Sequence, residues 1–308
     1  MTVRSTGIAS TLSILLLLSI NSSAQPTAQN LYVSVLDSKG GSVKGLRAED
    51  FKVKVDGKPS TVQAFSADAE PAMIIFAFDV SGSMGPSYEG DLVWLSRHAA
   101  MEFLDNSPDG DEYVLLAFAE NVVGKTAVVN KSAMIEAVKA DKYFPLLKEK
   151  RQTAIFGALG SALEVLKGSK STKKVIILVS DGQDNMSQEI SKVKSRLMAD
   201  QVALYSLCPI LNESDVSSLG LPGRQNEIEG LVDKSGGLSL VSRNLKEATT
   251  FMGRISNIIR NQYRISFGSP ATLSKDDEYK IEVSLALTKD RRKALGYPTL
   301  TYRRRLVQ

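Results

Sequence analysis

The stretch that decides the fold is Met73-Ile74-Ile75-Phe76-Ala77-Phe78-Asp79-Val80-Ser81-Gly82-Ser83. Its first six residues are all apolar, which is typical of a strand buried on both faces in a parallel sheet covered by helices. Asp79, Ser81 and Ser83 then follow at alternate positions, and a tight loop would aim these short oxygen-bearing side chains at one point. Open parallel sheets bind ligands beyond the carboxyl ends of their strands, so the stretch predicts a binding site at this end.

Oxygen-bearing side chains of this kind suit a hard cation, Mg²⁺ or Mn²⁺ rather than zinc. The alternative is an ordinary loop that caps the next helix, because serine and aspartate are both favoured at helix N-termini. A helix does follow the loop, since Leu92, Leu95, Ala99 and Phe103 recur at helical spacing. The short motif alone does not separate these two readings.

Asp-x-Ser-x-Ser after a buried strand resembles the metal-ion-dependent adhesion site (MIDAS) of von Willebrand factor A domains. That family also uses a threonine on a second loop and an aspartate on a third, and Thr153 and Asp181 stand in similar contexts. The resemblance covers about residues 71–260. Gly157 departs from it, because many family members carry an aspartate there. The metal ligands that the resemblance implies are Asp79, Ser81, Ser83, Thr153 and Asp181.

The resemblance implies a binding protein in which the cation, Mg²⁺ or Mn²⁺, is completed by an aspartate or glutamate of a protein partner. The three hydroxyls would bind the ion directly, and the two aspartates directly or through water. We do not expect an enzyme, since no histidine lies near these loops and no phosphate loop ending in Gly-Lys-Ser/Thr occurs. A scaffold of an envelope complex that binds through its β segments, with a purely structural metal, stays open as the alternative.

From Met73 onward, predicted strands alternate with predicted helices, which indicates an α/β fold with a doubly wound (Rossmann-like), mostly parallel sheet flanked by helices. The predicted strands are 73–78, 113–118, 127–129, 175–179, 202–207 and 238–241. The predicted helices after the first one are 132–140, 154–166, 187–199, 227–234 and 246–259.

The flanking segments, 30–70 and 261–308, read as β structure with alternating apolar and polar residues. The predicted strands are 31–36, 51–55, 61–65, 263–267, 279–285 and 299–306. Each segment is too short to bury a core alone, so we expect the two to form one β-sandwich with the A domain inserted between its halves. Asp50-Phe51 and Asp56-Gly57 resemble marks of exported bacterial von Willebrand factor A-related proteins of the acidobacterial type.

Residues 1–24 are predicted to be a cleaved signal peptide. Arg4 supplies positive charge, residues 14–18 lie in a short apolar core, and Ser22-Ser23-Ala24 precede a plausible cleavage site before Gln25. The apolar stretch is too short for a confident membrane span, and no further candidate span follows it. We therefore expect a periplasmic or secreted protein with no membrane span after cleavage.

The composition of the 308 residues is that of a soluble globular protein, with 43% hydrophobic and 23% charged residues. The formal net charge of +4 is too small to indicate nucleic-acid binding. The clusters Arg291–Lys293 and Arg303–Arg305 are interpreted as solvated ends of strands and turns. Cys208 is the only cysteine, which excludes an intramolecular disulfide, and its apolar surroundings predict a buried side chain.

Overall fold

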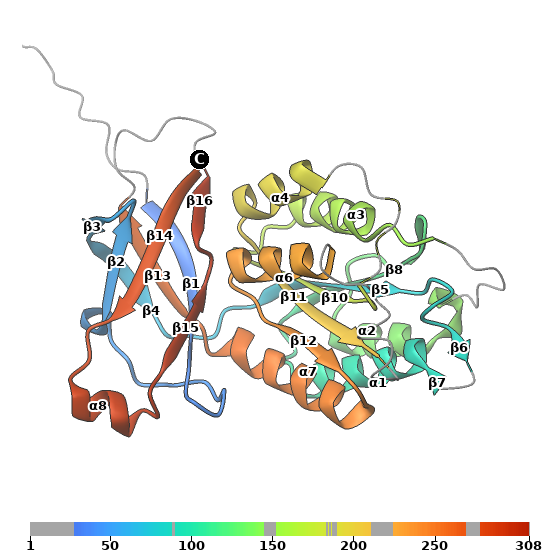
Figure 1. Cartoon of the computed structure of the whole chain (residues 1–308), viewed down its shortest axis with the longest axis horizontal. Coiled ribbons are helices and arrows are strands. Elements are labelled where there is room, and N and C mark those ends of the chain that lie inside the picture. Colours follow the sequence, from blue (N-terminus) through green and yellow to red (C-terminus); the bar gives the residue numbers. More distant parts are fainter. Residues whose placement is uncertain are drawn as a thin grey trace, which may run out of the picture.

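The computed structural model describes residues 28–87, 90–144, 152–182, 184, 186, 190–210, 224–268 and 278–307. They form an α/β domain and a β-sandwich that lie side by side (Figure 1). The predicted signal peptide, residues 1–24, lies outside the described residues. Within the described part of the chain, no helix has both the length and the apolar character needed to cross a bilayer.

The α/β domain is built on a six-stranded sheet of order β12-β11-β10-β5-β8-β9. Its strands are β5 (Ala72–Asp79), β8 (Glu112–Phe118), β9 (Val122–Lys125), β10 (Lys173–Val179), β11 (Val202–Pro209) and β12 (Ser239–Ser242). All neighbours are parallel except β8 and β9, which confirms the mostly parallel sheet. The predicted strand 127–129 is wrong, because the chain turns back directly after β8 and Val129 makes only an isolated bridge to Tyr113.

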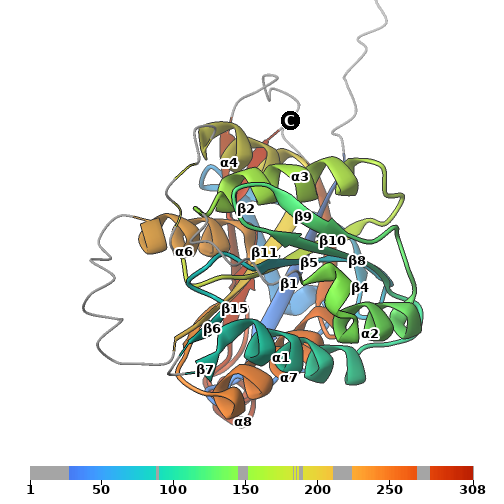
Figure 2. The same ribbon diagram turned by 90° about the vertical axis from the view of Figure 1, so that its right-hand side faces the viewer.

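Helices cover both faces of this sheet (Figures 1 and 2). One face carries α1 (Leu92–Asp105), α2 (Lys131–Lys139) and α7 (Leu245–Arg260). The other carries α3 (Ile155–Lys167), α4 (Ile190–Ala199) and α6 (Arg224–Ser235). Short elements, η2 (Asp141–Tyr143), β6 (Pro86–Ser87) and β7 (Gly90–Asp91), complete the domain. The helices predicted from apolar periodicity are thus present, with ends that differ by up to a few residues from the prediction. Residues 187–189 of the predicted helix 187–199 lie outside the described residues.

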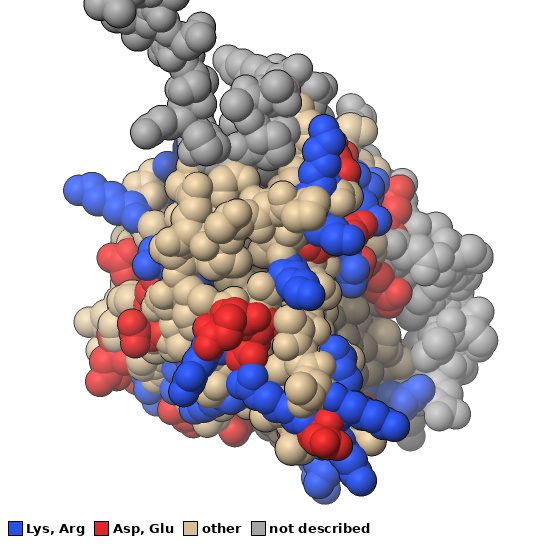
Figure 3. All heavy atoms as spheres, turned by 90° about the vertical axis from the view of Figure 1, so that its left-hand side faces the viewer, with Lys and Arg blue, Asp and Glu red and all other residues tan. Residues whose placement is uncertain are grey.

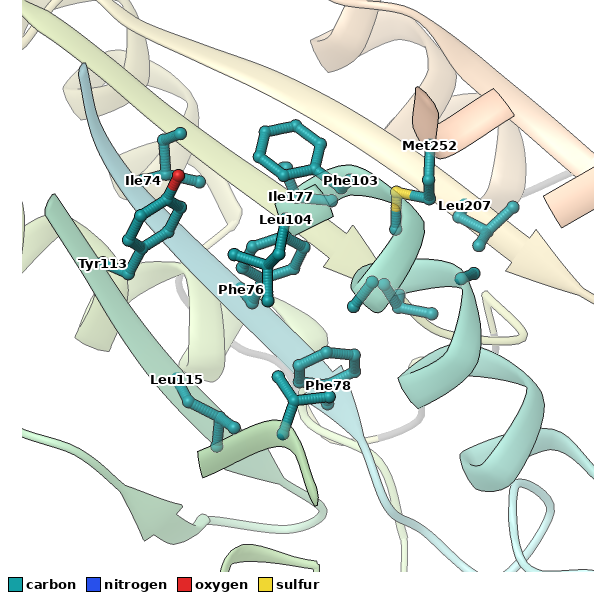
Figure 4. Close-up of a cluster of buried hydrophobic side chains, with 14 of the residues drawn as sticks. Ile74, Phe76, Phe78, Phe103, Leu104, Tyr113, Leu115, Ile177, Leu207 and Met252 are labelled. Carbon is teal, nitrogen blue, oxygen red and sulfur yellow. The ribbon is translucent and has the colours of Figure 1, made fainter. Parts of the chain in front are cut away.

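The apolar run that begins the decisive stretch is buried from end to end, as the sequence predicts. Ile74, Phe76 and Phe78 point toward α1 and α7, where Phe76 meets Phe103 edge to face at a ring-centroid distance of 5.2 Å (Figure 4). Met73, Ile75 and Ala77 face the opposite layer. Because both faces of β5 are covered, the strand is held firmly and the loop after Asp79 starts from a fixed point.

The N- and C-terminal β segments form one β-sandwich, which confirms that part of the predicted fold. One sheet has the order β15-β1-β13-β4 and the other β16-β14-β2-β3, so each mixes strands from both ends of the chain. The strands are β1 (Ala28–Leu36), β2 (Phe51–Val55), β3 (Lys58–Ser60), β4 (Val62–Ser66), β13 (Tyr263–Gly268), β14 (Glu278–Leu285), β15 (Thr299–Tyr302) and β16 (Arg305–Val307). Apolar side chains from both sheets share one buried cluster.

Two elements of the sandwich differ from the sequence-based expectation. The predicted strand 299–306 is divided, because β15 joins one sheet and β16 the other. A short helix, α8 (Lys289–Ala294), contains Arg291–Lys293, which were expected at strand ends or turns. Figure 3 shows basic side chains, with acidic ones among them, in the lower part of the sandwich face. In Figure 1, α8 lies in this lower part of the sandwich.

The dipeptides Asp50-Phe51 and Asp56-Gly57 both contribute contacts between the N- and C-terminal β segments. Asp50, at the end of η1 (Ala48–Asp50), is 2% exposed and forms an ion pair with Arg291 of α8. Phe51 packs against Tyr263 at a centroid distance of 5.3 Å. Asp56 has a φ of 47° in the turn after β2, and its Oδ1 accepts a hydrogen bond of 2.8 Å from the Lys280 amide. These contacts hold together segments more than 200 residues apart in the chain.

Arg303 is the clearest correction to the sequence analysis. It was expected to be solvated, but only 5% of its surface is exposed. The backbone between β15 and β16 passes against the end of α6, where the Arg304 amide donates 2.9 Å to the Lys234 carbonyl. A Cβ on Gly236 would lie 2.4 Å from the Tyr302 carbonyl carbon, so only glycine allows this approach. Arg303 is therefore enclosed between the sandwich and the α/β domain.

Candidate metal site

The candidate site lies where β5 and its two neighbours end, on the side of the α/β domain away from the sandwich (Figure 2). Phe78 of β5 is in register with Val179 of β10, so Asp79 and Ser180 follow side by side. Ser180 Oγ donates a hydrogen bond of 2.7 Å to Asp79 Oδ2. Asp79 Oδ1 accepts 2.8 Å from the Ser81 amide. The carboxylate is thus fixed from both sides and is 1% exposed.

The loop after Asp79 brings its two serines together. Ser81 Oγ and Ser83 Oγ lie 3.3 Å apart. Ser81 is buried and Ser83 is exposed, so the pair reaches from the interior to the surface. The Met84 amide donates 3.0 Å to the Ser81 carbonyl, and Met84 itself is completely buried. Met84 therefore anchors the loop by packing.

The second loop places Thr153 beside the end of β8. The Ala154 amide donates a hydrogen bond of 2.9 Å to the carbonyl of Ala119. Ala119 directly follows Phe118, which is the partner of Asp79 in β8. Thr153 is 3% exposed, and α3 begins two residues later. Because β8 is the neighbour of β5, this threonine lies at the same sheet edge as the first loop.

The third loop carries Asp181, which follows directly on Ser180 and is 4% exposed. Ser180 continues the parallel pairing, since its amide donates 3.2 Å to the Leu207 carbonyl of β11. Gly182 has a φ of +84°, and its amide donates 3.1 Å to Ser180 Oγ. The loop turns sharply here, which a glycine permits at no steric cost. The structure thus brings all five predicted residues to three adjacent loops, and their role as ligands stays a prediction.

Asp184 caps the start of α3, a helix that precedes it in the chain. Its Oδ2 accepts 3.1 Å from the Phe156 amide in the first turn of α3, and its Oδ1 accepts 3.1 Å from the Met186 amide. Asp184 is 4% exposed. It therefore links the third loop to the helix that leaves the second loop.

Two buried carboxylates, those of Asp79 and Asp181, dominate the electrostatics of the site. Burial, and then the negative charge of Asp181, raise the pKa of Asp79 to about 7. Hydrogen bonds from Ser180 and Ser81 partly offset this. Two acidic side chains in such surroundings favour a positive ion between them. Among the residues that the structure describes, no cluster of three or more His, Cys, Asp or Glu side chains could hold a metal, so hydroxyls would have to contribute.

Cys208, at the end of β11, is not a competing ligand. It is buried, as predicted, and burial together with the charge of Asp181 raises the pKa of its thiol to about 12. Metal binding requires the thiolate, which this environment strongly disfavours. The thiol therefore behaves as a small apolar side chain.

The sequence did not single out Ser180 or Trp94. Ser180 joins two of the loops through Asp79, and its position directly before Asp181, on the strand next to β5, was the available signal. Trp94 is 48% exposed on the first turn of α1. Its ring lies 3.9 Å from that of His98, measured between centroids. Trp94 thus adds an exposed aromatic side chain to the helix that follows the first loop.

Comparisons with known proteins agree with this architecture. Residues 74–183 match the family model of the von Willebrand factor type A domain. A solved structure described as von Willebrand factor type A from Catenulispora acidiphila has a TM-score of 0.51 at 13% identity, over 93% of this chain and 75% of that one.

Proximal thread matrix protein 1 from the mussel byssus has a TM-score of 0.50 at 21% identity, over 67% of this chain and 49% of that one. Its form with a zinc-occupied MIDAS motif gives 0.48 at 18% identity, with the same coverage of both chains. A search of curated proteins gave no match. Residues 74–183 are therefore similar to the von Willebrand factor type A domain, and the α/β part of this chain has the fold of that solved structure.

Proposed function

We propose that this protein is a metal-dependent protein-binding module. A divalent cation, Mg²⁺ or Mn²⁺, is held at the candidate site and is completed by an aspartate or glutamate of a partner protein. The ligands in this proposal are Asp79, Ser81, Ser83, Thr153 and Asp181. The observation that carries it is the meeting of two buried carboxylates and a serine pair at the ends of adjacent parallel strands.

The donor set fits the proposed ion by its chemistry. Carboxylate and hydroxyl oxygens are hard ligands, which suit Mg²⁺ and Mn²⁺. Two aspartates supply the charge that balances a divalent ion, and neutral hydroxyls leave it electrophilic toward a further carboxylate. Ser83 is exposed while Asp79 and Ser81 are buried, so a partner would approach from the side of Ser83. The bound ion supplies the contact, and the chain holds its own oxygens in place without a catalytic step.

We also propose that the protein works outside the cytoplasm. The support is the sequence of residues 1–24, with its basic start, apolar core and small residues before Gln25. N-terminal sequencing of the protein recovered from its native host tests this. A chain that begins at Gln25 would support export, and one that retains Met1 would contradict it.

Calorimetric titration of the chain from Gln25 onward with Mg²⁺, Mn²⁺ and Zn²⁺ tests the metal site. Saturable binding that is lost in Ser83→Ala would support it. Ser132→Ala, on the exposed start of α2, is the matched control and should bind as the unchanged protein does. If neither the unchanged protein nor the control binds any of the ions, even with acetate as a stand-in carboxylate, the metal site is wrong.

Partner binding is tested separately. Proteins that a chelator releases from the immobilised chain, and that fail to bind Ser83→Ala, would support the proposed function. A partner that stays bound in chelator, and binds Ser83→Ala equally well, would instead favour a scaffold that binds through the β-sandwich.

A further inference from the structure

A small cavity of about 30 Å³ lies at the junction between the β-sandwich and the α/β domain. It lies at the amino ends of β10 and β11, opposite to the candidate metal site. Two buried cationic side chains line it, Lys173 with 2% and Arg303 with 5% of its surface exposed, and the partly buried Lys174 is a third. Buried charges are costly unless another charge or several hydrogen bonds compensate them. The surroundings of these two cations therefore decide what the cavity can hold.

Lys173 is compensated by the protein itself. Its Nζ donates 2.9 Å to the Ile259 carbonyl and lies 5.0 Å from the centre of the Tyr32 ring. Burial lowers the pKa of Lys173 to about 8, but the carboxylates of Glu70 and Asp111 oppose that shift. Two acidic groups thus act on this one ammonium group.

Arg303 has no such compensation. Its Nη1 donates 3.2 Å to the Met198 carbonyl and its Nη2 donates 3.3 Å to the Asn30 carbonyl. Among the residues that the structure describes, no carboxylate forms an ion pair with this guanidinium. Met198 belongs to the last turn of α4, and a helix end provides only a partial negative charge. Burial alone lowers the pKa of Arg303 to about 10.

We propose that the cavity binds one small monovalent inorganic anion, of the chloride class, beside the Arg303 guanidinium. A guanidinium has five N–H donors, of which two serve the carbonyls, so donors remain for an anion. A buried water needs about 10–15 Å³ measured in the same way, so the cavity has room for about two waters or one such ion. The small volume favours an ion of the size of chloride over a phosphate or an organic acid.

The ion would join three parts of the chain. Arg303 comes from the segment between β15 and β16, Asn30 from β1 of the sandwich and Met198 from α4 of the α/β domain. A bound anion would strengthen this contact by neutralising the charge that the contact buries. Since an ion that binds only the folded protein shifts the unfolding equilibrium, stability should depend on chloride.

The test is urea unfolding of the chain from Gln25 onward while chloride replaces gluconate at constant sodium and constant ionic strength. We expect the midpoint to rise with chloride and then to saturate. Arg303→Met should remove this dependence. Arg304→Met is the matched control, because the neighbouring arginine is half exposed and pairs with Asp233; this variant should keep the dependence. The proposal would be overturned if the urea midpoint of unfolding did not change with chloride, or if it changed equally in both variants.

Anomalous scattering from crystals grown in bromide gives a second measurement, which needs no variant. A bromide peak beside the Arg303 guanidinium would support the proposal. Ordered water alone at that position would overturn it, whether or not Arg303→Met folds. Neither measurement involves the candidate metal site, so each can fail independently of the proposed function.

Discussion

Ser180→Ala is the substitution that tests the geometry of the metal site most directly. Ser180 Oγ donates 2.7 Å to Asp79 Oδ2 and accepts 3.1 Å from the Gly182 amide, so one hydroxyl orients a carboxylate of the first loop and the turn after Asp181. Alanine removes both contacts without adding bulk. Ser180 is 2% exposed, so water has little access to take over the lost hydrogen bonds.

A hydrogen bond to a charged group is worth about 1.5–3 kcal/mol, and about 1.4 kcal/mol corresponds to a tenfold change in affinity. The contact to Asp79 alone therefore predicts about 10–100-fold weaker Mn²⁺ binding in Ser180→Ala. Outer contacts that orient metal ligands have effects of the same size in other proteins. Ser180→Thr keeps the hydroxyl and should recover most of the affinity.

Calorimetric Mn²⁺ titration of the chain from Gln25 onward is the assay, with urea unfolding to show that each variant is folded. Ser96→Ala is the matched control, since Ser96 is also buried and its Oγ donates 2.6 Å to the Leu92 carbonyl in α1. It should leave Mn²⁺ affinity unchanged. If Ser180→Ala bound Mn²⁺ as tightly as the control while Ser83→Ala did not bind, the positioning role of Ser180 would be refuted but the site would stand.

Three further predictions concern stability, each measured by urea unfolding. Asp50→Ala should cost about 2–3 kcal/mol, because it breaks the buried pair with the partly exposed Arg291. Burial would raise the pKa of Asp50, but hydrogen bonds from the Arg47 amide and Arg291 lower this pKa overall. The contribution of Asp50 to the free energy of unfolding is therefore present above about pH 4 and is lost as the pH falls through the lowered pKa. Burial lowers the pKa of Lys173 from 10.5 to about 8. Between these pH values the unfolded chain binds one more proton than the folded chain, so the free energy of unfolding should rise with pH by up to about 3 kcal/mol. Lys173→Met should abolish this rise. Gly236→Ala should cost about 2 kcal/mol or more, because φ is +84° and the added Cβ would overlap the Tyr302 backbone. An unchanged midpoint in Gly236→Ala, a pH profile of Lys173→Met that still rises, or an Asp50→Ala protein as stable at pH 7 as the unchanged chain would each contradict the corresponding argument.

Features coded by neighbouring residues could be predicted from the sequence. Burial of 73–78 on both faces follows from six consecutive apolar residues, and the helical spacing of Ala248, Met252 and Ile255 predicts α7. The order of the three loops follows once the strands are placed, because parallel neighbours end at one edge. These inferences use patterns that repeat every two or about four residues.

Features that depend on distant parts of the chain could not be predicted. Arg303 looks like a surface residue in its basic cluster, and only its approach to α6 and α4 buries it. Asp184 looks like a cap for the next helix, yet its acceptor atoms meet an amide of α3, 28 residues earlier. The division of 299–306 into two strands likewise follows from packing of the two sheets, which the alternating pattern does not contain.

The two ends of the central strands are suited to different tasks. Both connections to the sandwich, from β4 to β5 and from α7 to β13, leave the α/β domain at the end where β5 and β10 begin, which is also where Lys173 and Arg303 are buried. The candidate metal ligands lie at the opposite end of the same strands. If the proposed function holds, a partner at the metal would bind at the end opposite both links, and the surface of the sandwich would stay available for a second contact.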